Sequence, residues 1–199
     1  MCRACWLTWL TWPGIGFAPV RTLREDVEAA IERDPAASGW AEVVLFSPGM
    51  HALWLYRVAH WLWTADRRLA ARALSYLARL LTGVEIHPAA DIGRRVVIDH
   101  GIGVVIGATA TVGDDVLIYH GVTLGSRRPT TGNRHPTIGD GVLLGAGATV
   151  LGPVEIGDGC RVGADALVLE SQPPDTTVVG GPDPGSRHAA AVGETVPAG

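Results

Sequence analysis

The sequence is poor in cysteine, in phenylalanine and in charged side chains. Its 199 residues include three Cys, two Phe and only 18% charged residues, with 16 Lys and Arg against 20 Asp and Glu, for a formal net charge of −4. This balance argues against a nucleic-acid-binding protein that works by neutralising phosphates. Cys2, Cys5 and Cys160 are too few for a disulfide-stabilised scaffold, so we expect a reducing compartment, the cytoplasm.

Long hydrophobic runs are also absent. No segment reaches the roughly 18 uninterrupted apolar residues of a membrane-spanning helix, and the best candidate, 51–63, is interrupted by Arg57 and His60. We therefore expect no membrane span. Residues 1–21 lack the cleavage site of a signal peptide, and we expect a disordered or helical lead-in with no assigned function. Apolar residues still make up 47% of the chain, which is enough to bury a core.

Residues 22–83 have the pattern of a helical domain. Thr22, with Glu25 three residues later, forms a capping box, which predicts the start of a helix. This helix should stop before the Asp-Pro pair at 34–35. A second helix is predicted to begin at the Ser-Pro pair at 47–48, because Ser caps helices and Pro suits their first turn.

A third helix is predicted over residues 66–81. It ends at Gly83, since glycine suits the residue that follows a helix. One side of this helix is apolar, with arginines around it. The apolar residues are Leu69, Ala73, Leu77, Leu80 and Leu81.

After Gly83, aliphatic residues recur every six positions. They are Ile92, Ile98, Ile106, Val112, Ile118 and Leu124, and then Ile138, Leu144, Val150, Ile156, Val162 and Val168. This period is the signature of a parallel β-helix, in which a short strand and a tight corner take six residues and three faces close a coil of about 18. We expect an α+β fold: the helical segment, a β-helix over 84–181, and a flexible tail over 182–199.

Two interruptions break the period. Ile98 and Ile106 are eight residues apart rather than six, and Leu124 and Ile138 are 14 apart. A regular solenoid has flat faces, so pockets come from insertions or from contacts between copies. Both interruptions carry histidine and charged residues, which favours an enzyme over a purely structural repeat protein.

His100, in the first interruption, is the candidate general base. Imidazole has an unperturbed pKa near 6.5, which suits proton transfer at neutral pH. The alternative is a histidine that bonds a carbonyl at a corner of the coil. Glu85 lies 15 residues upstream, close to one coil of about 18 residues. It could accept the other ring N–H and fix the tautomer, or it could simply be solvated.

Arg134 and His135 close the second interruption. A guanidinium fork beside an imidazole suits the binding of a carboxylate, and the alternative is a solvated loop. Arg127 and Arg128, earlier in the same segment, could meet phosphates or be solvated. The spacings from His87 through His100 and onward give no close pair of histidines, so we expect no metal site. No G-x-S-x-G elbow occurs, so a covalent acyl-enzyme is also not expected.

At this point the motifs resemble a known family. The stretches VEIHPAADIGRRVVIDHGIGVVIG, VLIYHGVTLG, NRHPTIGDGVLLGAGATVLGPVEIGDG and PPDTTVVGG, with ERDPAA and SPGMHALWLYRVAHWLW upstream, resemble the serine O-acetyltransferases in their compact bacterial form. The resemblance covers about residues 24–181. It implies a left-handed β-helix, a homotrimer or a dimer of trimers, and active sites between neighbouring subunits. The implied reaction moves acetyl from acetyl-CoA, a co-substrate, to the hydroxyl of L-serine, with no permanently bound cofactor.

The resemblance also implies a role for individual residues. His100 would be the base and Glu85 the carboxylate that orients it. Asp99 and Asp34 would bind the amino and hydroxyl end of serine, and Arg134 and His135 its carboxylate. The coenzyme would lie along a groove whose candidate lining is Gly125, Ala146, Arg127 and Arg128.

The chain departs from the family pattern near this site. The usual GETA reads Gly107-Ala108-Thr109-Ala110, so a carboxylate is missing, and the usual TLGGTGK loop is altered over 123–129. Two further hypotheses therefore stay open beside serine acetylation. One is a CoA-dependent acyltransferase with another hydroxyl or amine acceptor, and the other is a non-catalytic trimeric scaffold. A zinc hydrolase or lyase on the same coil is a more distant alternative.

Overall fold

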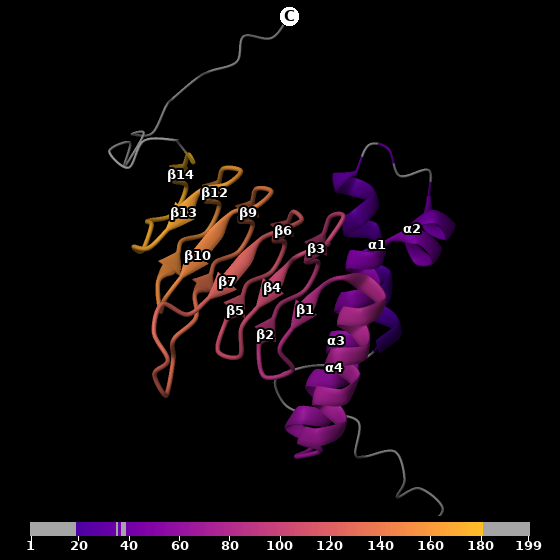
Figure 1. Ribbon diagram of the computed structural model, residues 1–199. Coiled ribbons are helices and arrows are strands. Elements are labelled where there is room, and N and C mark those ends of the chain that lie inside the picture. Colours follow the sequence, from indigo (N-terminus) through magenta and orange to yellow (C-terminus); the bar gives the residue numbers. More distant parts are fainter. Residues whose placement is uncertain (1–18, 35, 37–38, 181–199) are drawn as a thin grey trace, which may run out of the picture.

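The six-residue period builds a left-handed parallel β-helix. In the computed structural model, which describes residues 19–34, 36 and 39–180, short strands form three parallel sheets that we name faces A, B and C (Figure 1). Face A consists of β1 Glu85–Ile86, β4 Val105–Ile106, β7 Thr123–Gly125, β10 Thr149–Leu151 and β13 Leu167–Val168. Face B consists of β2 Asp91–Ile92, β5 Thr111–Val112, β8 Thr137–Ile138 and β11 Glu155–Ile156. Face C consists of β3 Val97–Ile98, β6 Leu117–Ile118, β9 Leu143–Leu144, β12 Arg161–Val162 and β14 Thr177–Val178.

The register between coils confirms the period and locates both insertions. Ile106 pairs with Leu124 across one regular coil of three six-residue repeats. Ile86 pairs with Ile106 across a coil that the first interruption lengthens by two residues. Val112 pairs with Ile138 across a coil that the second interruption lengthens by eight. The twelve periodic aliphatic residues all point inward and are at most 7% exposed.

Three corners connect the faces, and they carry seven of the candidate site residues: Asp99, His100, Arg127, Arg128, Arg134, His135 and Ala146. Corner AB comprises 87–90, 107–110, 126–136 and 152–154. Corner BC comprises 93–96, 113–116, 139–142 and 157–160. Corner CA comprises 99–104, 119–122, 145–148 and 163–166. The two-residue insertion therefore lies on corner CA and the eight-residue insertion on corner AB, at opposite edges of face A.

Four helices precede the coil among the described residues: α1 Pro19–Arg33, α2 Trp40–Phe46, α3 Pro48–Thr64 and α4 Arg68–Thr82 (Figure 1). The helices α1, α3 and α4 contact the first strands of the coil, and α2 packs on α1 and α3. The predicted start of the first helix is wrong, since α1 begins at Pro19 and Thr22 lies inside it. Glu25 pairs with Arg94 of the coil at 2.6 Å. The predicted start at the Ser47-Pro48 pair is confirmed, whereas α2 was not predicted.

The face that α4 buries is not its apolar side. Its buried residues are the small ones, Ala71, Ala78 and Thr82, because only small side chains let the helix approach α3 and β1 closely. Leu69 is 86% exposed and Leu80 64%. Gly83 then ends the helix in the left-handed conformation, as predicted.

The lead-in predicted over 1–21 lies outside the described residues except for 19–21, which are the first residues of α1. The flexible tail predicted over 182–199 lies outside them entirely. Within the described part of the chain, no helix combines the length and apolar character that crossing a bilayer requires.

Candidate active site

His100 lies at corner CA, directly after β3, where the two-residue insertion widens the turn. Its backbone is in the left-handed region, with φ of 59°. The N–H of Gly101 donates to the carbonyl of Asp99 at 2.7 Å and holds the turn. The side chain of His100 is 73% exposed, and its Nε2 lies 3.9 Å from Oδ1 of Asp99. The imidazole is therefore open to a molecule bound outside the coil.

A second imidazole lies beside this one. The rings of His100 and His120 meet edge to face, with centroids 6.0 Å apart. His120 occupies the same corner one coil further on, and its carbonyl accepts the N–H of Gly147 at 2.9 Å. Ala146, predicted to line the coenzyme groove, precedes that glycine. Corner CA thus stacks His100, His120 and Ala146 in successive coils.

Glu85, the predicted partner of His100, makes a different contact in this chain. Its Oε2 lies 3.0 Å from Nη1 of Arg79, near the end of α4, and both side chains are about half exposed. Glu85 begins β1, beneath the turn that carries His100, because the N–H of Gly103 donates to the carbonyl of Gly83. The role of Glu85 in orienting His100 stays a prediction, and Arg79 is a partner that the sequence did not indicate.

Arg134 and His135 lie at corner AB, at the end of the eight-residue insertion. His135 is buried, at 7% exposed, and its Nδ1 accepts the backbone N–H of Thr109 at 3.2 Å. Burial, and then the charge of Arg134, lower the pKa of His135 below its ordinary value. At neutral pH the ring is uncharged, and Arg134 is the cation of the pair.

His87 belongs to the same corner. Its ring meets Trp63 edge-on at 5.2 Å between centroids, and its Nδ1 accepts the N–H of Ala89 at 3.0 Å. Burial lowers the pKa of His87 to about 4, and the nearby Arg72, His135 and Arg134 add to the effect. His87 is therefore an uncharged neighbour of the Arg134 guanidinium.

An arginine-lined cavity opens on the outer side of the inserted loop. It has a volume of about 310 Å³, and its lining includes Ser126, Arg127, Arg128, Asn133, Arg134 and Pro153. Arg127 reaches the carbonyl of Leu169 at 3.3 Å, and Arg134 donates to the carbonyl of Thr130 at 3.0 Å. Three guanidinium groups around one cavity suit a carboxylate or a phosphate.

Gly125 ends β7 on face A, between the two corners. It pairs in register with Leu151, and a Cβ at Gly125 would meet the Leu151 side chain at 2.8 Å. The Leu151 side chain therefore fills the space beside Gly125, and only glycine fits at this position without a shift of Leu151.

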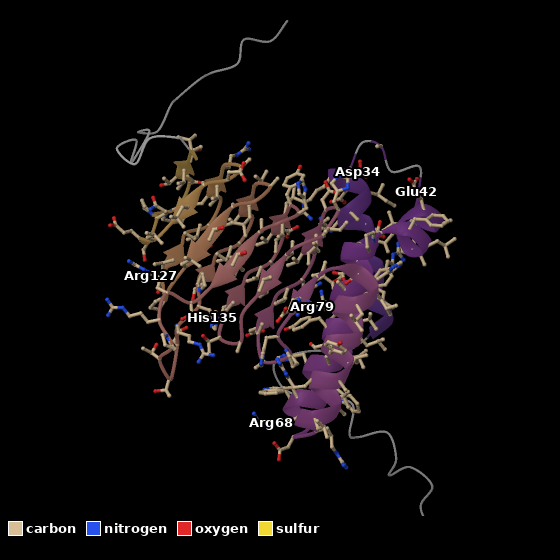
Figure 2. All side chains as sticks on the ribbon, in the orientation of Figure 1. Asp34, Glu42, Arg68, Arg79, Arg127 and His135 are labelled. Carbon is tan, nitrogen blue, oxygen red and sulfur yellow. The ribbon has the colours of Figure 1, made fainter. Side chains whose placement is uncertain are left out.

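Asp34 lies away from corner AB. It follows α1, is exposed, and its Oδ1 accepts the N–H of Ala36 at 2.8 Å. The adjacent Arg33 donates to the carbonyl of Arg95 at corner BC. Figure 2 shows Asp34 at the end of α1, well apart from His135 and Arg127 on the opposite side of the coil. Within one chain, the predicted site residues thus lie at corners CA and AB, on β1 and β7 of face A, and after α1.

Metal ligands do not gather in the described part of the chain. Across residues 19–34, 36 and 39–180, no group of three or more His, Cys, Asp or Glu side chains is placed to hold a metal ion. Cys160, buried in the coil, has a free thiol that donates to the carbonyl of Pro173.

Comparison with known families gives two matches. Residues 18–54 match the family described as "Serine acetyltransferase, N-terminal". Residues 135–169 match the family described as "Bacterial transferase hexapeptide (six repeats)". The first match covers α1, α2 and the start of α3, and the second covers the later coils.

Individual relatives agree with these matches. The serine acetyltransferase of Mycobacterium tuberculosis is 58% identical over 160 residues, covering 80% of this chain and 70% of the relative. That of Staphylococcus aureus (strain Mu50) is 49% identical over 163 residues, covering 82% and 76%. The crystal structure of Neisseria gonorrhoeae serine acetyltransferase in complex with serine has a TM-score of 0.79 at 40% identity, covering 82% of this chain and 67% of that one. The Brucella abortus strain S19 enzyme in complex with coenzyme A has a TM-score of 0.80 at 42% identity, covering 82% and 65%.

Proposed function

The chain belongs to the serine acetyltransferase family, and on this premise we propose that it transfers the acetyl group of acetyl-CoA to the hydroxyl of L-serine. The product is O-acetylserine, an intermediate of cysteine synthesis. The observation that carries the proposal is the 58% identity to a serine acetyltransferase across 70% of its length. The exposed imidazole at the insertion of corner CA supplies the base that such a transfer needs.

The chemistry requires one base and no nucleophile from the protein. The serine hydroxyl attacks the carbonyl carbon of the thioester, so that a C–O bond forms and the C–S bond breaks. His100 accepts the hydroxyl proton as the bond forms and returns it to the departing thiolate. A positioned base of this kind typically contributes about 10²–10⁴-fold in rate. We propose that Glu85 orients His100 once substrates are bound. Before they bind, Arg79 holds the Glu85 carboxylate.

We assign the two ends of the acceptor to different corners. The guanidinium of Arg134 and the neutral ring of His135 bind the serine carboxylate. Asp99, beside the base, and Asp34, at the end of α1, bind the amino and hydroxyl end. Opposite charges placed in this way orient a zwitterionic amino acid with its hydroxyl toward the imidazole.

We place acetyl-CoA along the outer side of the coil. The arginine-lined cavity of about 310 Å³ receives phosphate groups of the coenzyme through Arg127 and Arg128. Gly125 and Ala146 line the path from this cavity to the imidazoles, since neither residue projects a bulky side chain. Acetyl-CoA is a substrate in this scheme, and we propose no permanently bound cofactor or metal.

We propose that the working site forms between subunits of a homotrimer. His100 at corner CA and Arg134 at corner AB lie at opposite edges of face A, so a neighbouring chain can bring one edge against the other. The exposed apolar side of α4, with Leu69, Leu77, Leu80 and Leu81, is a surface that such an assembly can cover. Two trimers could stack into a hexamer by covering further exposed apolar surface in the same way.

The free thiol of Cys160 fits a reducing compartment, and we propose that the reaction takes place in the cytoplasm.

Subunit mixing tests the shared site. His100→Ala and Arg134→Ala are each expected to be nearly inactive, and co-expression places both kinds of chain in one trimer. If neighbours share each site, about a quarter of the sites in an even random mixture contain both intact residues. Activity near a quarter of wild type supports the shared site. Activity no higher than the sum of the two variants would show that each chain acts alone.

A panel of acceptors tests the reaction itself. Purified enzyme with acetyl-CoA and a thiol-detecting reagent is expected to release CoA with L-serine and far less with L-threonine, L-homoserine or amines. Release with another acceptor and none with serine would establish a different acyltransferase. No release with any acceptor, together with no effect of His100→Ala on growth without cysteine, would establish a scaffold.

A further inference from the structure

Thr109 occupies the position at corner AB that lies one coil below His135. The strands that follow them pair in register, Thr111 with Thr137. The two side chains therefore come from equivalent places in consecutive coils, although they are far apart in the sequence. Thr109 remains in the segment 107–110, where the family's usual glutamate is replaced by alanine.

Four contacts join Thr109 to the end of the inserted loop. Its hydroxyl oxygen accepts the backbone N–H of Arg134 at 3.1 Å and that of His135 at 3.2 Å. The same oxygen lies 2.8 Å from Nδ1 of His135. The backbone N–H of Thr109 donates to that nitrogen at 3.2 Å.

These contacts determine which ring nitrogen of His135 carries the proton. A hydroxyl has one proton and two lone pairs. The N–H groups of Arg134 and His135 occupy both lone pairs, so the hydroxyl of Thr109 donates to Nδ1. Nδ1 also accepts the backbone N–H of Thr109 and therefore carries no proton. The ring is neutral, with its proton on Nε2.

The surroundings of the ring keep it in this orientation. His135 is 7% exposed, and its Cδ2 and Nε2 edge packs against Gly107, where a Cβ would overlap the ring. Burial and the charge of Arg134 favour the neutral form, since both lower the pKa of His135. His87 is a further ionisable neighbour at this corner, since His135 and Arg134 both help to lower its pKa.

We propose that Thr109 is a positioning residue for the acceptor: it holds His135 as a fixed Nε2–H donor to the carboxylate of the amino-acid substrate. The inference rests on the proposed role of Arg134 and His135 in binding that carboxylate. Thr109 acts only through the ring and the two backbone N–H groups. A donor whose tautomer is already set loses little freedom when the substrate binds. Arg134 supplies the charge, so the ring does not have to be protonated.

Two variants of the full-length enzyme separate the hydroxyl from the size of the side chain. Thr109→Val keeps the shape and removes the hydroxyl, and Thr109→Ser keeps the hydroxyl. Thr109→Val is expected to raise the KM for serine about tenfold, the effect of losing one well-placed hydrogen bond. Its kcat and its KM for acetyl-CoA should stay within about twofold, and Thr109→Ser should restore the KM for serine. An unchanged KM for serine in Thr109→Val, or equal increases in both KM values, would overturn the inference.

Nitrogen NMR of the histidine rings provides a readout independent of activity. The His135 signals are identified by their loss in His135→Asn. In the wild type at neutral pH, Nδ1 should have the shift of an unprotonated nitrogen and Nε2 that of a protonated one. Thr109→Val should give a mixture of tautomers, and Thr109→Ser the wild-type pattern. A protonated Nδ1 in the wild type would overturn the inference, even in a fully active enzyme. Failure of the proposed function gives a different result, because the wild type would then release no CoA with serine, whatever the tautomer of His135.

Discussion

The buried ion pair between Asp26 and Arg57 is expected to control the stability of the helical part. The side chain of Asp26 is 0% exposed and that of Arg57 is 17% exposed. Nη2 of Arg57 donates to Oδ1 of Asp26 at 3.1 Å, and Nε donates to Oδ2 at 3.3 Å. Nη2 also reaches the carbonyl of Gly93 at 3.3 Å. One guanidinium thus connects α1, α3 and the first coil.

Arg57→Met keeps most of the side chain and removes the cation. The Asp26 carboxylate is then buried without its counter-charge, which typically costs about 3–5 kcal/mol of the free energy of unfolding. For a chain of this size the loss corresponds to a melting temperature lower by on the order of 10 °C. Asp26→Asn combined with Arg57→Met should recover part of the loss, because no unpaired charge remains. Urea unfolding followed by circular dichroism, at one fixed protein concentration, measures these free energies.

The penalty should also depend on pH. Burial raises the pKa of Asp26 and Arg57 opposes that rise, so in Arg57→Met the pKa of Asp26 rises further. A carboxyl whose pKa is higher in the folded than in the unfolded state loses stabilising effect as pH rises through the folded value. Arg57→Met should therefore be less destabilised at pH 5 than at pH 8.

A matched control exists on α1, the helix that carries Asp26. Arg24 of α1 pairs with Glu28, but these side chains are 71% and 38% exposed, so Arg24→Met should leave the free energy of unfolding nearly unchanged. If Arg57→Met costs no more than Arg24→Met at pH 8, the account of the buried pair is refuted.

Three further predictions concern the site. His100→Ala should lower kcat about 10²–10⁴-fold with an unchanged melting temperature, since the side chain is 73% exposed; steady-state kinetics and thermal unfolding check both. Gly107→Ala should raise the KM for serine more than that for acetyl-CoA, because its Cβ would overlap the His135 ring; equal effects on the two substrates would contradict this. Arg127→Gln and Arg128→Gln should each raise the KM for acetyl-CoA severalfold, and added salt should reduce the difference from wild type, as expected for phosphate contacts.

The coil was predictable because its period repeats over many turns. Each periodic residue from Ile92 to Val168 fills the interior of the coil. Every repeat therefore gives separate support for the same register. The irregular spacings were predictable for the same reason. Excess residues between Ile98 and Ile106 and between Leu124 and Ile138 have no place on a flat face and must project from it.

The helical part was less predictable because its signals are local. Thr22 and Glu25 satisfy a capping pattern, yet the helix begins at Pro19 and Glu25 forms an ion pair with Arg94. The pattern of α4 distinguishes an apolar side but not what that side faces. Close packing of α4 places Ala71 and Ala78 in the interior. The spacing of apolar residues does not predict which side of the helix packs closely against its neighbours.

Thr109 was missed for a reason that the register explains. The sequence separation between Thr109 and its partner His135 equals one regular coil plus the insertion at corner AB. Without the length of that insertion, the period does not predict that the two residues meet. The expected contact between Glu85 and His100 was inferred from the length of a regular coil, without the two residues of the first insertion. The regular period predicts which residues face inward, whereas contacts on the outside of the coil depend on the insertions.

The two insertions lie at opposite edges of one face, and this placement bears on how the site can work. The insertion with His100 is at the CA edge of face A, and the insertion with Arg134 is at its AB edge. Between them, outward-pointing Val105 and Leu167 are 37% and 59% exposed, which leaves apolar surface available to another chain. A single coil cannot bring its own two edges together, because face A is a continuous sheet that keeps them apart. If an imidazole and a guanidinium must act on one serine, the second edge has to come from a neighbouring subunit. The assembly is then part of the catalytic site.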